Sequence, residues 1–238
     1  MRNPFKPSAG TNPPELIGRS GVLATFERGL SERSGGLDAT VITGARGIGK
    51  TVMLGAAEDL ARGRGWGVIS ETATQRLAGR LQEWIPRHAE PMGRVITVDE
   101  IHAVNRRELI QIGADLENLA NDGQHVALVV AGLPALVDEL LSDESAAFLR
   151  SADRIVLRNV PVDDVEESFA RTFAGGGFET PAKALRQAAE ATEGYPYLIQ
   201  LVGYHLWREA GDGHGLTAAT AARAIGRAQA RIARTDLT

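Results

Sequence analysis

Two hydrophobic patterns alternate along most of this chain of 238 residues. Short apolar runs bounded by turn residues predict buried strands, whereas apolar residues three or four positions apart predict amphipathic helices. The runs that predict strands are 39–43, 66–72, 95–98, 126–131 and 154–157. Because helical patterns separate these runs, the sequence predicts an α/β core with a parallel five-stranded sheet flanked by helices.

The helices of this core are expected around Leu23–Leu30, at 51–62, 73–88 and 105–119, and as short helices through Leu141 and over 145–150. After Val160 the pattern changes, and helical segments follow one another without a strand. The expected caps of these segments are Asp163 and Asp164, Thr180 with Pro181 next to it, and Thr217. The sequence therefore predicts an extended lead-in at 1–15, the α/β core at 16–160 and a small all-α domain at 161–238.

Composition limits the partners and the cellular compartment that can be expected for the protein. The formal net charge is −4 and 43% of the residues are hydrophobic, so the overall balance favours neither nucleic acid nor an anionic membrane as a partner. The chain has no cysteine, its N-terminal segment lacks the apolar stretch of a signal peptide, and no run is long enough to span a membrane. We therefore expect a cytoplasmic protein without a membrane partner.

Residues 41–51, VITGARGIGKT, carry the most specific motif in the chain. The pattern GxxxxGKT between a strand and a helix is that of a P-loop, or Walker A motif, whose backbone N–H groups surround a phosphate. Lys50 is expected to reach the β- and γ-phosphates, and Thr51 to ligate Mg²⁺. The residues expected to bind the nucleotide here are Gly44, Ala45, Arg46, Gly47, Ile48, Gly49, Lys50, Thr51 and Val52. The alternative is a glycine-rich turn with an incidental lysine.

A second motif, RVITVDEIH, ends a buried strand with two carboxylates about fifty residues after the P-loop. This is the pattern of a Walker B motif. Asp99 is expected to hold the Mg²⁺ shell, and Glu100 to orient or deprotonate the attacking water. His102 follows on the same segment; it either forms a hydrogen bond within the loop or senses the γ-phosphate.

These motifs and the trailing helical domain together resemble the AAA+ superfamily of ATPases. More narrowly, PPELIGR, VDEIH and EGYPYLIQLVG are similar to bacterial and archaeal ATPases related to origin-recognition and STAND-type switch proteins. The resemblance implies that ATP or ADP with Mg²⁺ binds between the core and a helical lid. Ile17 and Gly18 are expected to line the adenine pocket, or else only to begin the first core helix. Tyr195 and Pro196 match the GxP motif of STAND proteins, which also lies at the nucleotide.

The chain departs from the AAA+ pattern in three ways. Ala131 and Gly132 stand where many AAA+ proteins have the polar residue called sensor 1, and the lid lacks the arginine that touches the γ-phosphate in many relatives. These two departures favour weak or regulated hydrolysis. Third, origin-like and STAND relatives usually continue into a winged-helix domain, whereas this sequence stops at Thr238, just past its last expected helix. Either the sequence is a piece of a longer chain or the protein lacks that module, through which a protein client or DNA would bind.

Two sets of arginines are candidates for function. Arg150 and Arg154 lie just before or within the fifth strand, where an arginine finger would complete the site of a neighbouring subunit in a homo-oligomer; the alternative is a structural or solvent-facing role. In the last helix, arginines recur at helical spacing at Arg223, Arg227, Arg231 and Arg234. They form a phosphate-contacting stripe, the solvated face of an amphipathic helix, or the dock for a further C-terminal domain.

The leading functional hypothesis is an ATPase that hydrolyses ATP to ADP and phosphate to drive conformational change or assembly, with Lys50, Glu100, Arg150 and Arg154 as its catalytic residues. A nucleotide-gated switch with little turnover is the alternative from another class. A DNA-associated ATPase of the transposition-helper or origin type is the third hypothesis, and it depends on the family analogy.

Overall fold

The computed structural model describes residues 2–7, 15–32, 37–88, 92–211 and 215–235. Its contacts divide the chain into two units. The first, here called the α/β unit, comprises Gly21–Arg46 and Lys50–Arg158; the second, the helical unit, comprises Met1–Ser20, Gly47–Gly49 and Asn159–Thr238. Residues 16–20, which the expected boundaries place in the core, thus group with the helical unit.

The α/β unit is built on a parallel sheet with five strands in the described part of the chain. The strands are β1 (Leu37–Thr43), β2 (Gly67–Thr72), β3 (Arg94–Asp99), β4 (Val126–Gly132) and β5 (Asp153–Val156). Their order is β2-β3-β4-β1-β5, and every pairing is parallel. The predicted parallel five-stranded sheet is therefore confirmed. Since β4 separates β3 from β1, the ends of these three strands meet at one edge of the sheet.

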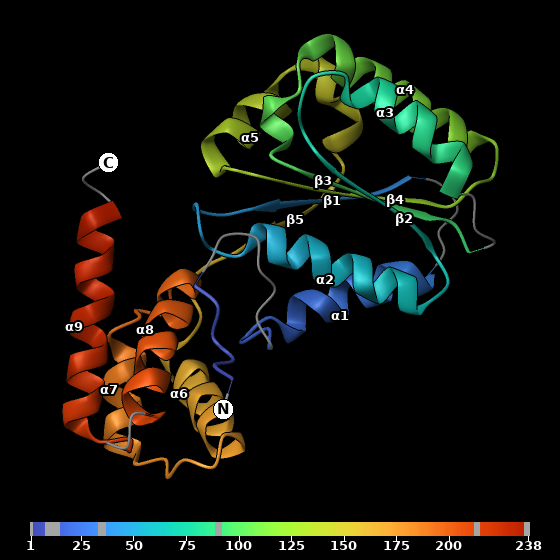
Figure 1. The fold of residues 1–238 in the computed structure, drawn as a ribbon. Coiled ribbons are helices and arrows are strands. Elements are labelled where there is room, and N and C mark those ends of the chain that lie inside the picture. The colour runs from blue at the N-terminus through green and yellow to red at the C-terminus, as the bar shows by residue number, and fades with distance from the viewer. Residues whose placement is uncertain (1, 8–14, 33–36, 89–91, 212–214, 236–238) are drawn as a thin grey trace. The chain divides into compact units, whose positions relative to one another are not determined.

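Helices cover both faces of this sheet, which explains why its central strands are continuous apolar runs. In Figure 1, α1 (Ser20–Glu32) and α2 (Lys50–Gly63) lie on one face, and α3 (Leu77–Trp84), α4 (Arg106–Asn121) and α5 (Pro134–Ser142) on the other. Short 3₁₀ helices complete the unit: η1 (Ile85–His88), η2 (Ile101–Ala103) and η3 (Glu144–Leu149). Leu77, Leu116 and Ile96 are fully buried between the layers.

Two expected helices of this unit differ from the structure. The helix expected over 73–88 begins only at Leu77, because Arg76 has a left-handed backbone with φ of 65°, and it continues past Trp84 as the 3₁₀ helix η1. Pro86 lies in η1 and cannot donate a backbone hydrogen bond, which ends the regular α-helix. The helix expected over 145–150 is likewise the 3₁₀ helix η3.

The helical unit contains α6 (Val162–Gly175), α7 (Ala182–Glu190), α8 (Pro196–Glu209) and α9 (Ala218–Thr235). Its core includes an aromatic cluster in which the ring of Phe173 lies 5.3 Å from that of Trp207. Phe5, from the segment expected to be an extended lead-in, joins this cluster 5.7 Å from Phe169 and is only 5% exposed. Residues 2–7 form no helix or strand, but through Phe5 they contribute to the core of the unit.

The expected helix caps are correct at one position and wrong at the others. Asp163 and Asp164 lie in the first turn of α6, whose N-cap is Pro161, and Thr180 precedes Pro181, the N-cap of α7. Neither proline can cap through a side-chain oxygen, so no side-chain cap bond forms there. The cap at Thr217 is confirmed, since its Oγ1 accepts a hydrogen bond from the Thr220 backbone N–H at 3.2 Å.

Candidate nucleotide and magnesium site

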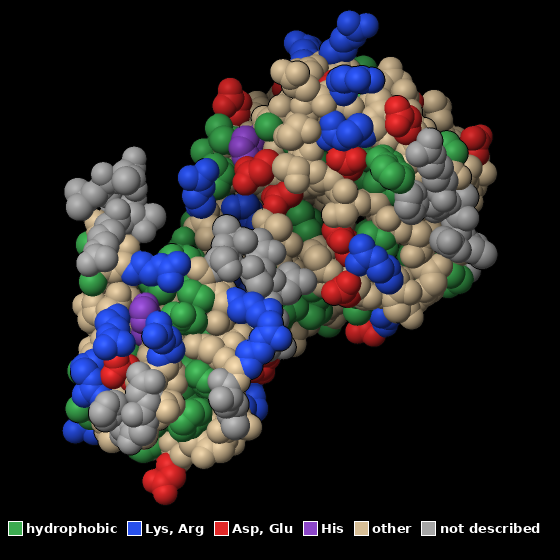
Figure 2. Space-filling model, viewed as in Figure 1, with side chains coloured by type: hydrophobic (Ala, Val, Ile, Leu, Met, Phe, Trp, Pro, Cys, Tyr) green, Lys and Arg blue, Asp and Glu red, His purple; other side chains and the backbone are tan. Residues whose placement is uncertain are grey.

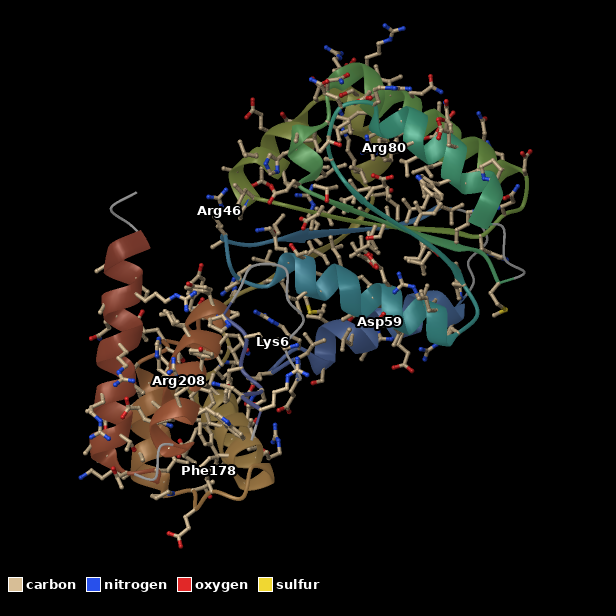
Figure 3. All side chains as sticks on the ribbon, in the orientation of Figure 1. Lys6, Arg46, Asp59, Arg80, Phe178 and Arg208 are labelled. Atoms are coloured by element: carbon tan, nitrogen blue, oxygen red, sulfur yellow. The ribbon has the colours of Figure 1, made fainter. Side chains whose placement is uncertain are left out.

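The loop between β1 and α2 has the backbone that the P-loop motif requires. Its residues 44–49 connect Thr43 to Lys50, the first residue of α2. Gly47 and Gly49 have φ values of 76° and 98°, a region that residues with a Cβ rarely adopt. Arg46, labelled in Figure 3, is exposed at the turn of this loop. The glycines thus allow a tight turn directly before a helix N-terminus, where an anion is favoured.

Lys50 is buried although it carries a charge. Its side chain is 6% exposed, and its Nζ donates hydrogen bonds to the carbonyl oxygens of Gly44 at 3.0 Å and Ala45 at 3.1 Å. A lysine ammonium group has three donors that can turn to new acceptors. Lys50 is therefore held against the loop itself, in a position from which the same donors can serve a phosphate oxygen.

Thr51 and Asp99 bring a hydroxyl and a carboxylate together at the end of the sheet. The Thr51 hydroxyl donates a hydrogen bond to Asp99 Oδ2 at 2.5 Å, and the Glu100 backbone N–H donates to Asp99 Oδ1 at 2.9 Å. Mg²⁺ prefers oxygen ligands and is commonly held by one or two protein groups together with substrate phosphates. The pair fits such an ion. No group of three or more His, Cys, Asp or Glu side chains able to hold a metal by themselves occurs among the described residues.

Glu100 stands next to this pair in an unusual backbone conformation. Its φ is 56°, and η2 begins directly after it. The Glu100 carboxylate is 45% exposed, and its Oε2 lies 3.2 Å from Nε2 of His102. The interpretation that His102 contacts its own loop agrees with this position, but neither interpretation named Glu100 as the partner. The sequence signal for this contact was that Glu100 and His102 are two positions apart in DEIH. This spacing brings the two side chains together because the chain turns there as the 3₁₀ helix η2.

In the helical unit, Val160 lies against Gly18 and Gly194, next to residues that the sequence predicts at the adenine base. A Cβ added to Gly18 would lie 3.1 Å from a methyl group of Val160. The Val160 backbone N–H donates to the Gly194 carbonyl oxygen at 2.8 Å, and α8 begins at Pro196 soon afterwards. The structure therefore gathers Gly18 and the segment 194–196 around one residue. Ile17 packs against the core of the same unit and Tyr195 is half-buried, and the nucleotide contacts of all four expected residues stay predictions.

Both finger candidates are exposed side chains of the α/β unit. Arg150 donates a hydrogen bond to the Asp143 carbonyl oxygen at 3.3 Å, and Arg154, on the edge strand β5, lies 3.6 Å from the Asp138 carboxylate. An exposed ion pair such as Arg154–Asp138 contributes little to stability, so Arg154 can change partner at little cost. A role in a neighbouring subunit stays a prediction.

The arginine stripe of α9 is partly explained by packing within the helical unit. Arg223 and Arg227 lie 2.8 Å and 2.7 Å from the carboxylate oxygens of Glu209, whose side chain is 4% exposed. Arg231 donates to the Pro7 carbonyl oxygen at 3.5 Å, and the side chain of Arg234 lies outside the described residues. In Figure 2, Lys and Arg side chains still gather around a histidine on this unit. Arg223 and Arg227 therefore hold α9 against α8, and the stripe also presents positive charge.

The parallel sheet, the glycine loop before α2 and the acidic end of β3 define the fold of the AAA+ P-loop ATPases. No protein-family model and no curated protein sequence matches the chain. Among solved structures, the RuvB Holliday junction branch migration motor of Thermotoga maritima matches with a TM-score of 0.69 at 17% identity, over 88% of this chain and 69% of that chain.

Two further matches have the same fold. The Aeropyrum pernix ORC2 protein, solved as ADPNP–ADP complexes, matches with a TM-score of 0.69 at 13% identity, over 92% of this chain and 70% of that one. Domain III of the replication initiation protein DnaA of Thermotoga maritima matches with a TM-score of 0.64 at 13% identity, over 90% and 93% of the two chains. At these identities the likeness shows the fold. In the described ranges, no helix is both long and apolar enough to cross a bilayer.

Proposed function

We propose that this protein binds ATP with Mg²⁺ and hydrolyses it to ADP and phosphate, using the energy for conformational change or assembly. One observation carries the proposal: the hydrogen bond of 2.5 Å between Thr51 and Asp99, which joins the end of the P-loop to the end of β3. Thr51 and Asp99 are 48 positions apart in sequence, and the sheet order β2-β3-β4-β1-β5 brings their segments together. Lys50 and Glu100 flank that pair along the chain.

Each residue has a task that follows from its chemistry. Lys50 leaves the loop carbonyls and donates to the phosphates, while the backbone N–H groups of residues 45–50 stabilise the charge that develops there. Thr51 and Asp99 would hold Mg²⁺, which when bound neutralises phosphate charge. Glu100 accepts a proton from the attacking water or orients it, and its exposed carboxylate is accessible to that water.

A glutamine substitution at Glu100 tests this assignment. Glu100→Gln keeps the size of the side chain and removes the base, so it is expected to retain nucleotide binding and to lower phosphate release about 100-fold. Lys50→Ala is expected to weaken nucleotide binding itself. Glu117→Gln, at an exposed position of α4, is the matched control and should turn over like wild type. Turnover at the wild-type rate in Glu100→Gln would exclude Glu100 as the catalytic carboxylate.

A nucleotide-gated switch with little turnover is the second candidate. The observation that favours it is the end of β4, where Ala131 and Gly132 provide no polar side chain to assist the water. Steady-state phosphate release separates the two functions: tight binding of nucleotide without Lys50-dependent release of phosphate would favour the switch.

An association with DNA is a third candidate, supported by exposed positive charge in the helical unit. Arg208, labelled in Figure 3, and Arg231 are exposed in the helical unit. The names of the matched RuvB and DnaA structures also concern DNA processes. Binding of duplex DNA that weakens steeply with salt, and is lost when Arg208 and Arg231 are changed to Glu, would support this candidate. Absence of binding at low salt would dismiss it.

A further inference from the structure

The catalytic candidate Glu100 has a fixed backbone but an exposed side chain. Its N–H donates to Asp99 Oδ1 at 2.9 Å, and its carbonyl oxygen accepts from the Ala103 N–H at 2.8 Å. The carboxylate itself is 45% exposed. Ordering a free glutamate side chain costs rotamer entropy. A carboxylate that must place a water therefore benefits from a rigid partner.

His102 provides such a partner. Its Nε2 lies 3.2 Å from Oε2 of Glu100, and its side chain is only 17% exposed. The contact spans a single 3₁₀ turn, so both residues are on one short, hydrogen-bonded segment after β3. In contrast with a long exposed lysine or arginine, an imidazole ring has few rotamers to lose when it is held in place.

The ring is held by the end of the neighbouring strand. A Cβ added to Gly132, the last residue of β4, would lie 3.1 Å from Nδ1 of His102 and 2.6 Å from a methyl group of Val137. Val137 and, at a longer distance, the His102 ring therefore pack against the space beside Gly132. Its Nδ1 is buried and has no hydrogen-bond partner in the described part of the chain, so Nε2 is the nitrogen that engages a polar group.

We propose that His102 is a positioning residue that holds the Glu100 carboxylate through Nε2. The inference rests on the proposed function of Glu100 in ATP hydrolysis. In this arrangement the segment after β3 supplies the polar group that the end of β4 lacks. His102 acts through Glu100 and does not touch the substrate.

The test uses His102→Ala and His102→Gln in the full chain, each also combined with Glu100→Gln. His102→Ala is expected to lower kcat about tenfold with ATP affinity unchanged, because it removes the 3.2 Å contact between Nε2 and the Glu100 carboxylate. His102→Gln can place an amide N–H near the position of Nε2 and is expected to restore most of that loss. His125→Ala, at another half-buried histidine of the α/β unit, is the matched control and should match wild type.

The double variants distinguish positioning from a structural or sensing role. In single-turnover assays, His102→Ala should cause no further loss once Glu100 is Gln, since its effect passes through that carboxylate. An equal fold loss in both backgrounds, or a changed preference for ATP over ADP, would overturn the inference. Wild-type kcat in His102→Ala would also overturn it while leaving the proposed function intact, whereas absence of Lys50-dependent turnover in wild type would overturn both.

Discussion

At the scale of single residues, backbone space constrains the chain most tightly at Gly194. A Cβ at this position would lie 1.8 Å from the carbonyl oxygen of Val160, and Gly194 has φ of 70° directly after Glu193 with φ of 49°. Two consecutive left-handed residues turn the chain into α8, and the Val160 hydrogen bond closes the turn. The glycine in the sequence EGYP is therefore required by geometry, whether or not the segment also binds nucleotide.

Gly194→Ala is expected to destabilise the helical unit strongly. Left-handed backbone strain costs an alanine about 1–2 kcal/mol, and the steric overlap with Val160 adds about 1–3 kcal/mol. Gly177→Ala is the matched control, because Gly177 has φ of 74° in the same unit and no atom within 4 Å of its added Cβ. Denaturant unfolding should show a clearly larger loss for Gly194→Ala. Equal losses would mean that the overlap is relieved without cost.

His205 makes the stability of the helical unit sensitive to acid. Burial lowers its pKa, and the charges of Arg231, Arg227 and Arg208 lower it further, against the opposing effect of Glu209. The folded state therefore favours the neutral form of His205, whereas a histidine in the unfolded chain takes up its proton at about pH 6.5. Stability is fully present above that pH and falls as the pH decreases below it.

Replacing His205 by Gln should accordingly flatten the dependence of unfolding free energy on pH between about 6.5 and 5. Urea unfolding at a series of pH values measures this slope. His125→Gln serves as the control, because His125 belongs to the α/β unit. An unchanged slope in His205→Gln would show that other groups cause the acid sensitivity.

At the scale of elements, apolar runs made the five strands predictable, because a sheet covered on both faces leaves a continuous hydrophobic signature. The glycine spacing and the DE pair likewise predicted the segments that meet through Thr51 and Asp99. The start of α3 at Leu77 could not be predicted from the sequence, because no sequence pattern indicates the left-handed backbone of Arg76. The contact of His102 with Glu100 depends on a 3₁₀ turn that periodicity does not reveal.

The place of Phe5 was also beyond the sequence pattern, because one aromatic residue in a proline-rich segment has no period. Phe5→Ala is expected to destabilise the helical unit by about 3 kcal/mol, since the ring is 5% exposed and packs near Phe169 and Phe173. Phe5→Leu should lose less. Thermal unfolding of the two variants measures the difference, and a wild-type midpoint in Phe5→Ala would show that residues 2–7 are not part of this core.

At the scale of the whole molecule, an arginine finger would make each nucleotide site depend on two chains. If Arg150 or Arg154 serves a neighbouring subunit, turnover per chain should rise with protein concentration, and replacing that arginine by Ala should lower kcat while nucleotide affinity stays the same. Arg107→Ala, an exposed arginine of α4, is the matched control. Unchanged turnover in both finger variants would exclude this role.

The most direct test of the account is steady-state phosphate release by the purified protein with ATP and Mg²⁺, compared with the Lys50→Ala variant. The account predicts turnover that requires Mg²⁺ and disappears in Lys50→Ala, because the buried ammonium group that bonds the loop carbonyls at 3.0 Å and 3.1 Å is the group that engages the phosphates. Phosphate release that is equal in the two proteins would contradict it.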